Sequence, residues 1–128
     1  MKNYSFWGKI KSFLHNEQPR VFFREADVWF CHLGENIGFE QDGKGKDFLR
    51  PVVVIRKFNQ QVLWGAPLTS RIVSGPYYFN VHFGNNRNNS AILSQLRLID
   101  AKRLKYKIGA IPRRDFYALT KKLKDLIP

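Results

Sequence analysis

Apolar and polar residues alternate in short runs along most of the chain, a pattern typical of half-buried β-strands. The clearest run is "YYFNVHF" over 77–83, where every second residue from Tyr77 to Phe83 is apolar. Other short runs are rich in β-branched and aromatic residues, which favour strands. We expect these further strands over 28–33, from Arg50 or Pro51 to Phe58, over 62–70 and over 91–99.

Two features within this pattern predict interruptions. Pro67 lies in the third expected strand and donates no ladder hydrogen bond, so it predicts an edge position or a bulge. The stretch "GNNRNNS" over 84–90 consists of residues that tolerate turns, and we expect it to be one.

Helical spacing of apolar residues occurs near the two ends of the chain. Over 4–15 it predicts a short amphipathic helix with Phe6, Trp7, Ile10, Phe13 and Leu14 on one face. Near the C-terminus, Pro112 fits the first turn of a second helix. Its apolar stripe would consist of Phe116, Leu119, Leu123, Leu126 and Ile127. Between the strands and this helix, Asp100 is suited to cap a short helical turn over 102–104.

Five short strands with helices only at the ends predict a mainly β fold. We expect a small antiparallel β-barrel with an N-terminal and a C-terminal α-helix, because a sandwich would need about seven strands. The length fits one domain over 1–128. Within it, residues 1–20 would be a helical extension, and 25–127 would form the barrel and the terminal helix.

The charge is strongly positive and unevenly distributed. The formal net charge is +12, and residues 65–128 contain 12 Lys and Arg against 3 Asp and Glu. Surface cations gain free energy by releasing the counterions condensed on phosphates. The charge therefore favours a polyanionic partner such as nucleic acid, with a merely solubilising surface as the alternative.

Several other classes of protein are not favoured. The single cysteine, Cys31, rules out an intrachain disulfide. No apolar run reaches the roughly 18 residues of a membrane span, and we expect a cytoplasmic protein without membrane contact. His15, His32 and His82 have no zinc-site spacing, and no phosphate-binding glycine loop precedes a helix. We therefore expect neither a metal nor a cofactor.

Polar side chains at the ends of the expected strands are candidates for chemistry. Arg50 precedes the rigid Pro51, and its planar guanidinium can donate to two oxygens of one phosphate. Thr69 and Ser70 end the third strand and offer hydroxyl groups. Glu40, in the preceding loop, could accept a proton. Each has an ordinary alternative: a solvated or ion-paired arginine, a loop carboxylate and a turn-capping threonine.

Five segments of the chain, in this order, resemble the MazF/PemK family of toxins from bacterial toxin-antitoxin systems. They are "VWFCHLGENIGFEQ", "RPVVVI", "PLTS", "SQLRLIDAKRL" and "IG.I", followed by a terminal helix. Single segments such as "RPVVV" are unspecific, but the ordered set covers roughly residues 25–127. The resemblance implies an SH3-like β-barrel, usually a homodimer, that cleaves single-stranded RNA without a metal. It also implies inhibition by a cognate antitoxin protein.

The resemblance also assigns roles to individual residues. The loop arginine and the threonine that it implies for catalysis fall on Arg50 and Thr69, and the loop Glu-Gln pair falls on Glu40 and Gln41. The family's strand motif of glutamine, any residue and arginine falls on Gln95 and Arg97. We expect RNA binding by Gln41, Lys44, Lys46, Ser70, Gln95 and Arg97.

The chain departs from the family at defined positions. Its loop "DGKGKDFL", 42–49, is longer than in many members and brings Lys44 and Lys46. Ser94 and Phe39 stand where some members have aspartate and histidine. Glu40 is the candidate general base because it lies in the same loop. Two other functions remain open: a barrel that binds nucleic acid without cleaving it, and a toxin of the same fold that inhibits a protein such as a topoisomerase.

Overall fold

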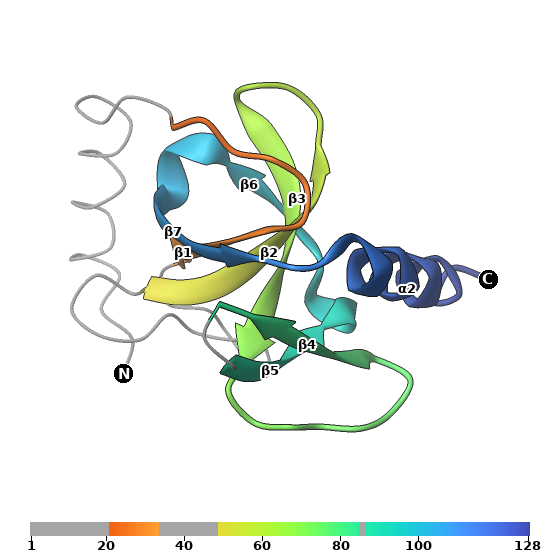
Figure 1. Ribbon diagram of the computed structural model, residues 1–128. Coiled ribbons are helices and arrows are strands. Elements are labelled where there is room, and N and C mark those ends of the chain that lie inside the picture. Colours follow the sequence, from red (N-terminus) through yellow and green to blue (C-terminus); the bar gives the residue numbers. More distant parts are fainter. Residues whose placement is uncertain (1–20, 34–48, 85–86) are drawn as a thin grey trace, which may run out of the picture.

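The computed structural model describes residues 21–33, 49–84 and 87–128, which form seven antiparallel strands and one α-helix (Figure 1). Two short 3₁₀ turns lie among the later strands. The elements in chain order are β1 (Asp27–His32), β2 (Leu49–Lys57), β3 (Val62–Thr69), β4 (Tyr78–Phe83), β5 (Arg87–Ile92), η1 (Leu93–Gln95), β6 (Arg97–Asp100), η2 (Ala101–Arg103), β7 (Leu104–Ala110) and α2 (Arg113–Lys124).

Strand β3 joins two parts of the sheet. One edge pairs with β2; on the other edge, Val62–Gly65 pair with β6, and Leu68 and Thr69 pair with β5. The strand order is β4-β5-β3-β2-β1-β7, with β6 beside β3. Figure 1 shows β7, β1, β2, β3 and β6 curving into a ring, with the β4–β5 hairpin extending from it. Within the described residues no ladder joins β6 to β7, so the ring is not closed by hydrogen bonds between these two strands. The short turn η2 connects them in the chain.

The inner core fills this ring. Strand alternation directs Val52 and Val54 of β2 toward it, together with Cys31 of β1. Buried side chains from β6, η2 and β7 complete the cluster, whose members are Phe23, Trp29, Cys31, Leu33, Val52, Val54, Leu63, Ile99, Ala101 and Leu104.

The outer core lies on the opposite face of β1, β2 and β3, where the β4–β5 hairpin and α2 cover it. Val53 and Ile55 of β2 belong to it, and Leu119 is the fully buried residue of the helix. Its other buried members are Val28, Ala66, Leu68, Val81, Phe83, Ala91, Leu93 and Ile111. Because both faces of β2 are buried, its sequence is a continuous apolar run rather than an alternating one.

Gly65 permits close packing at the centre of the inner core. A Cβ atom at this position would lie 2.5 Å from Val52 Cγ1 and 2.8 Å from Ile99 Cδ1. Both contacts are too short to be tolerated unless the side chains of Val52 and Ile99 shift. The glycine therefore favours the close approach of β2 and β6 to β3.

The structure confirms the mainly β, antiparallel fold with a C-terminal helix. The first four expected strands correspond to β1–β4, with boundary shifts of a few residues. Asp100 caps η2 as expected, because its Oδ1 accepts from the backbone N–H of Lys102 at 2.8 Å. The expected N-terminal helix over 4–15 lies outside the described residues.

The expectations for residues 84–110 were partly wrong. The polar stretch from Arg87 forms β5 rather than a turn, and the expected strand over 91–99 is divided by η1 into the end of β5 and β6. Pairing with β4 and β3 outweighs the low strand propensity of Asn88 and Asn89. The side chain of Ser90 also donates to Asn80 Oδ1 across the hairpin at 2.7 Å. Strand β7 was not predicted.

Three smaller expectations also differ from the structure. Pro67 lies in the central strand β3, not at an edge. On one side of β3, Pro67 falls between Gly65, which pairs with β6, and Leu68, which pairs with β5, so no ladder bond is needed from it there. Ile127 is 75% exposed, because α2 ends at Lys124 before the apolar stripe reaches it. Pro112 sits at the N-cap of the helix rather than in its first turn.

Candidate functional site

Arg50 lies within β2, not ahead of it. It is paired with Cys31 of β1 and is only 3% exposed. The sequence predicted a strand start at Arg50 or Pro51, but β2 extends back to Leu49 because β1 continues to His32 and supplies partners for both Leu49 and Arg50. Two residues before Val52, Arg50 shares the strand face that borders the inner core.

Thr69 is the last residue of β3, just beyond the point where the ladder between β3 and β2 stops. The last pair of that ladder is Val52 with Pro67, and Thr69 itself pairs with Ser90 of β5. The half-buried Thr69 Oγ1 accepts from the backbone N–H of Arg71 at 3.4 Å, which leaves its own O–H able to donate.

The other described RNA-binding candidates lie near this end of β3. Arg97 begins β6, pairs with Gly65 and is half-buried. Gln95 is the last residue of η1, so it belongs to a 3₁₀ turn and not to a strand. Ser70 follows β3 and is exposed. The structure does not describe the four loop candidates, Glu40, Gln41, Lys44 and Lys46.

Arg103 is a further arginine at this site that the sequence did not single out. Its Nη1 donates to the backbone oxygen of His32 at 3.2 Å, at the end of β1. Burial lowers the pKa of its guanidinium. The sequence indicated only that it belongs to the helical turn capped by Asp100; its approach to β1 depends on a contact between residues 71 positions apart.

Three arginines border the buried Cys31. Arg50 is its neighbour across the ladder, and the positive charges of Arg103 and Arg97 act on the thiol. Burial raises the pKa of Cys31 to about 12, although both charges oppose this effect. A concentration of guanidinium groups is suited to bind an anion with several oxygens, such as a phosphate diester.

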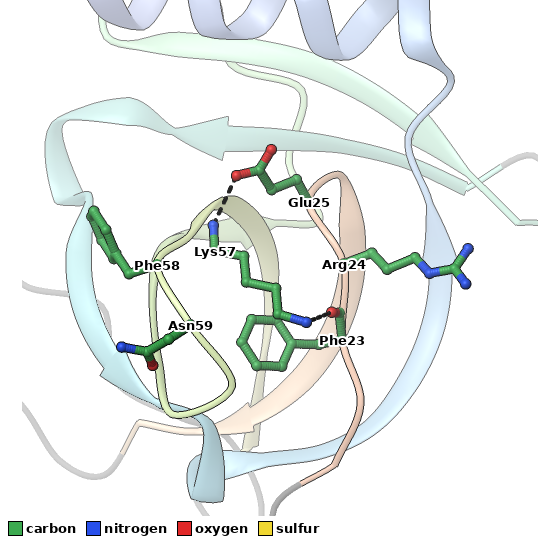
Figure 2. A pocket seen from close by; sticks show the side chains of 6 residues that line it. All are labelled: Phe23, Arg24, Glu25, Lys57, Phe58 and Asn59. Atoms are coloured by element: carbon green, nitrogen blue, oxygen red, sulfur yellow. Dashed lines mark hydrogen bonds between the residues drawn. The ribbon is translucent and has the colours of Figure 1, made fainter.

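A pocket of about 410 Å³ lies at the opposite end of β2 (Figure 2). It is lined by Phe23, Arg24, Glu25, Lys57, Phe58 and Asn59. Lys57 is held within the protein: its Nζ donates to the backbone oxygen of Phe23 at 2.9 Å, and its backbone N–H donates to Glu25 Oε2 at 2.9 Å. This pocket contains none of the residues suggested by the sequence.

The residues that the structure describes contain neither a candidate metal site nor a candidate membrane-spanning helix. No group of three or more His, Cys, Asp and Glu side chains in these residues could hold a metal ion. No described helix is long and apolar enough to cross a membrane.

Comparison with known proteins now decides the family. Residues 24–127 match the family model of the PemK-like, MazF-like toxins of type II toxin-antitoxin systems. The chain belongs to this family. The resemblance found in the sequence is thereby confirmed over nearly the same residues. Comparison with curated protein sequences gives no significant match.

Solved structures of MazF-type toxins share the fold. MazF of Deinococcus radiodurans aligns with 17% identity and a TM-score of 0.65, over 88% of this chain and 98% of that one. The Mycobacterium tuberculosis toxin MazF-mt6 aligns with 16% identity and a TM-score of 0.59, over 77% and 93%. An endoribonuclease in complex with its cognate antitoxin, from a mycobacterial species, aligns with 10% identity and a TM-score of 0.62, over 84% and 98%.

Proposed function

We propose that this toxin is a metal-independent endoribonuclease that cleaves single-stranded RNA. The observation that supports this most directly is that the ladder of β2 and β3 ends at Val52 and Pro67, with Arg50 and Thr69 each two residues beyond this last pair on their strands. Family membership and the similarity to a mycobacterial endoribonuclease support the same activity.

The reaction requires no group beyond those of RNA and protein side chains. A base removes the proton of a 2′-hydroxyl, whose oxygen attacks the adjacent phosphorus. The bond from phosphorus to the 5′-oxygen breaks, and that oxygen takes a proton. The products are a 2′,3′-cyclic phosphate and a 5′-hydroxyl. Negative charge develops on the non-bridging oxygens in the transition state, and fixed donors lower its free energy.

Arg50 and Thr69 are suited to the donor roles. The guanidinium of Arg50 is held by a buried position in β2, so its orientation is fixed before the substrate binds. The Thr69 O–H can donate to the same phosphate. Arg97 and Gln95 would bind neighbouring parts of the strand. We assign proton removal to Glu40, and RNA binding to Gln41, Lys44, Lys46 and Ser70.

The test is cleavage of single-stranded RNA by the purified chain in excess chelator. We expect cyclic phosphate ends, and a rate about a hundredfold or more lower for Arg50→Lys and Thr69→Val. Thr120→Val is a matched control, because Thr120 Oγ1 donates to Tyr117 O on the distant helix α2. Binding without cleavage would contradict the nuclease in favour of a binding barrel. If the chain neither binds nor cleaves the RNA, a protein target is favoured instead.

The role of Glu40 has a separate test. If it is the base, Glu40→Gln abolishes the acidic limb of the pH–rate profile as well as lowering the rate. A variant with full turnover and an unchanged profile would remove Glu40 from the mechanism.

We also propose that the chain forms a homodimer and binds a cognate antitoxin. Structures of MazE–MazF from Deinococcus radiodurans are among those that share its fold. Sedimentation of the purified chain measures the oligomeric state. Co-expression with the adjacent open reading frame, followed by an RNA cleavage assay of the complex, measures inhibition; an active complex would contradict the proposed antitoxin.

A further inference from the structure

Strand β7 exposes three consecutive residues, Lys105, Tyr106 and Lys107. Regular alternation would bury every second residue of a strand. Here the ladder to β1 has two register shifts: Phe30 pairs with Tyr106, but Cys31 pairs with Leu104, so Lys105 is passed over. A bulge of this kind redirects side chains, and bulges are frequent at sheet edges beside functional sites. Among the described strands, β7 pairs with β1 alone and forms the edge.

The exposed side chains combine positive charge with an aromatic ring. Lys105 is exposed, and Tyr106 is 46% exposed while its ring lies 5.1 Å from that of Phe30. Lys107 Nζ lies 3.1 Å from Asp27 Oδ1, so part of its charge is balanced within the protein. Lysine beside an anchored aromatic ring is the combination that binds single strands, because bases stack on the ring and phosphates contact the cation.

The start of β7 lies near the candidate catalytic site. Leu104 pairs with Cys31, and Cys31 pairs with Arg50, so two strand spacings, or about 10 Å, separate the start of β7 from Arg50. The segment 102–107 contains four cations and no acidic residue. Two of these cations, Lys105 and Lys107, lie on β7, and the other two lie on η2 just before it.

We propose that the exposed edge of β7, formed by Lys105, Tyr106 and Lys107, binds single-stranded RNA on one side of the cleaved phosphate. A base stacks on Tyr106, and a flanking phosphate contacts Lys105. This inference rests on the proposed ribonuclease function and adds a substrate-binding surface to it.

Edge lysines also have an ordinary role, since they prevent strands of other molecules from pairing with the sheet. That role predicts aggregation when Lys105 is replaced, but it requires no aromatic ring. The two roles are therefore distinguished by Tyr106→Leu, which keeps an apolar side chain against Phe30 and removes the stacking surface.

The experiment measures binding of RNA with 2′-O-methyl groups, which the proposed reaction cannot cleave, at several salt concentrations. We expect Lys105→Gln to reduce the slope of the logarithm of the binding constant against the logarithm of the salt concentration by about the amount due to one phosphate contact. We expect Tyr106→Leu to weaken binding about 5- to 100-fold for RNA of about 16 nucleotides. The control is Lys121→Gln, which removes one exposed charge from α2. Urea unfolding of each variant establishes that it is folded.

The outcomes separate this inference from the proposed function. If the wild type cleaves RNA but both β7 variants bind like the wild type, the β7 surface is overturned alone. If the wild type binds without cleaving and both variants weaken binding, the surface stands and the nuclease fails. If RNA binding is unchanged but a glutamate-rich peptide is bound less tightly by Lys105→Gln, the surface serves an acidic protein instead and the inference is wrong.

Discussion

The two ends of β2 each carry a cation, but the surroundings of these cations differ. Lys57 is surrounded by groups that stabilise it within the molecule: its Nζ donates to Phe23 O and lies 4.5 Å from the centre of the Phe22 ring (Figure 2 shows the bond to Phe23). Arg50 lies about 23 Å away along the strand. It is buried beside Cys31, where Arg97 and Arg103 also gather.

This difference separates a cation that serves the fold from one suited to a substrate. At the Lys57 end, a carbonyl, two aromatic rings and the carboxylate of Glu25 surround the strand. At the Arg50 end, three arginines lie on elements around the buried Cys31. A concentration of positive charge is therefore what distinguishes the Arg50 end of β2 from the pocket end.

The largest expected contrast is in cleavage. Arg50→Lys should lower the rate about a hundredfold or more, because an ammonium does not reproduce the two-point contact of a guanidinium. Lys57→Met should leave the rate unchanged. Initial rates on one RNA measure both, and equal losses would show that the two ends of β2 do not differ in function.

The second contrast concerns alkaline pH. The folded protein retains the proton of Cys31 up to a pH of about 12, whereas the unfolded chain loses it near the ordinary value of 9.0. Unfolding is therefore favoured as pH rises from about 9 toward 12, and the associated stability is fully present below 9. Urea unfolding across this range should show the decline in the wild type. In Cys31→Ala the part of this decline that is due to the thiol should be missing. If the stability of both proteins fell in the same way with pH, the burial of the thiol would be contradicted.

A smaller effect is expected on stability at the Lys57 end. Lys57→Met removes the bond to Phe23 and the contact with the Phe22 ring. We expect the free energy of unfolding to fall by about 1–2 kcal/mol, as measured in urea. Lys121→Met is the control, since its side chain is exposed on α2. An equal change in both variants would mean that the contacts of Lys57 contribute nothing specific.

The smallest expected effect lies beside the pocket. Phe58 and Trp64 form an edge-to-face pair with ring centroids 5.0 Å apart, and both are partly exposed. Phe58→Leu should lower the unfolding free energy by about 0.5 kcal/mol and change the fluorescence of Trp64. Cleavage should stay the same, and a large loss of activity would place function at this end of β2 as well.

Local pattern sufficed for part of the fold because the relevant forces act between neighbours in the chain. Alternation predicted β4, and the continuous apolar run predicted β2, which is buried on both faces. Asp100 was identified as a cap from its own position. The pattern failed at β5 and β7, where polar and charged residues form strands because a partner strand supplies the ladder: the neighbouring β4 for β5, and the distant β1 for β7.

The sequence by itself determined the mainly β fold with its terminal helix, the excess positive charge and the candidates Arg50 and Thr69, since residue types and spacing fix these properties. Tertiary structure alone decided that Arg50 is buried opposite Cys31, that Arg103 reaches His32 and that β7 exposes Lys105 and Tyr106. The physical reason is that strand register, bulges and contacts across the barrel depend on pairing between segments far apart in the chain, and no local pattern encodes these.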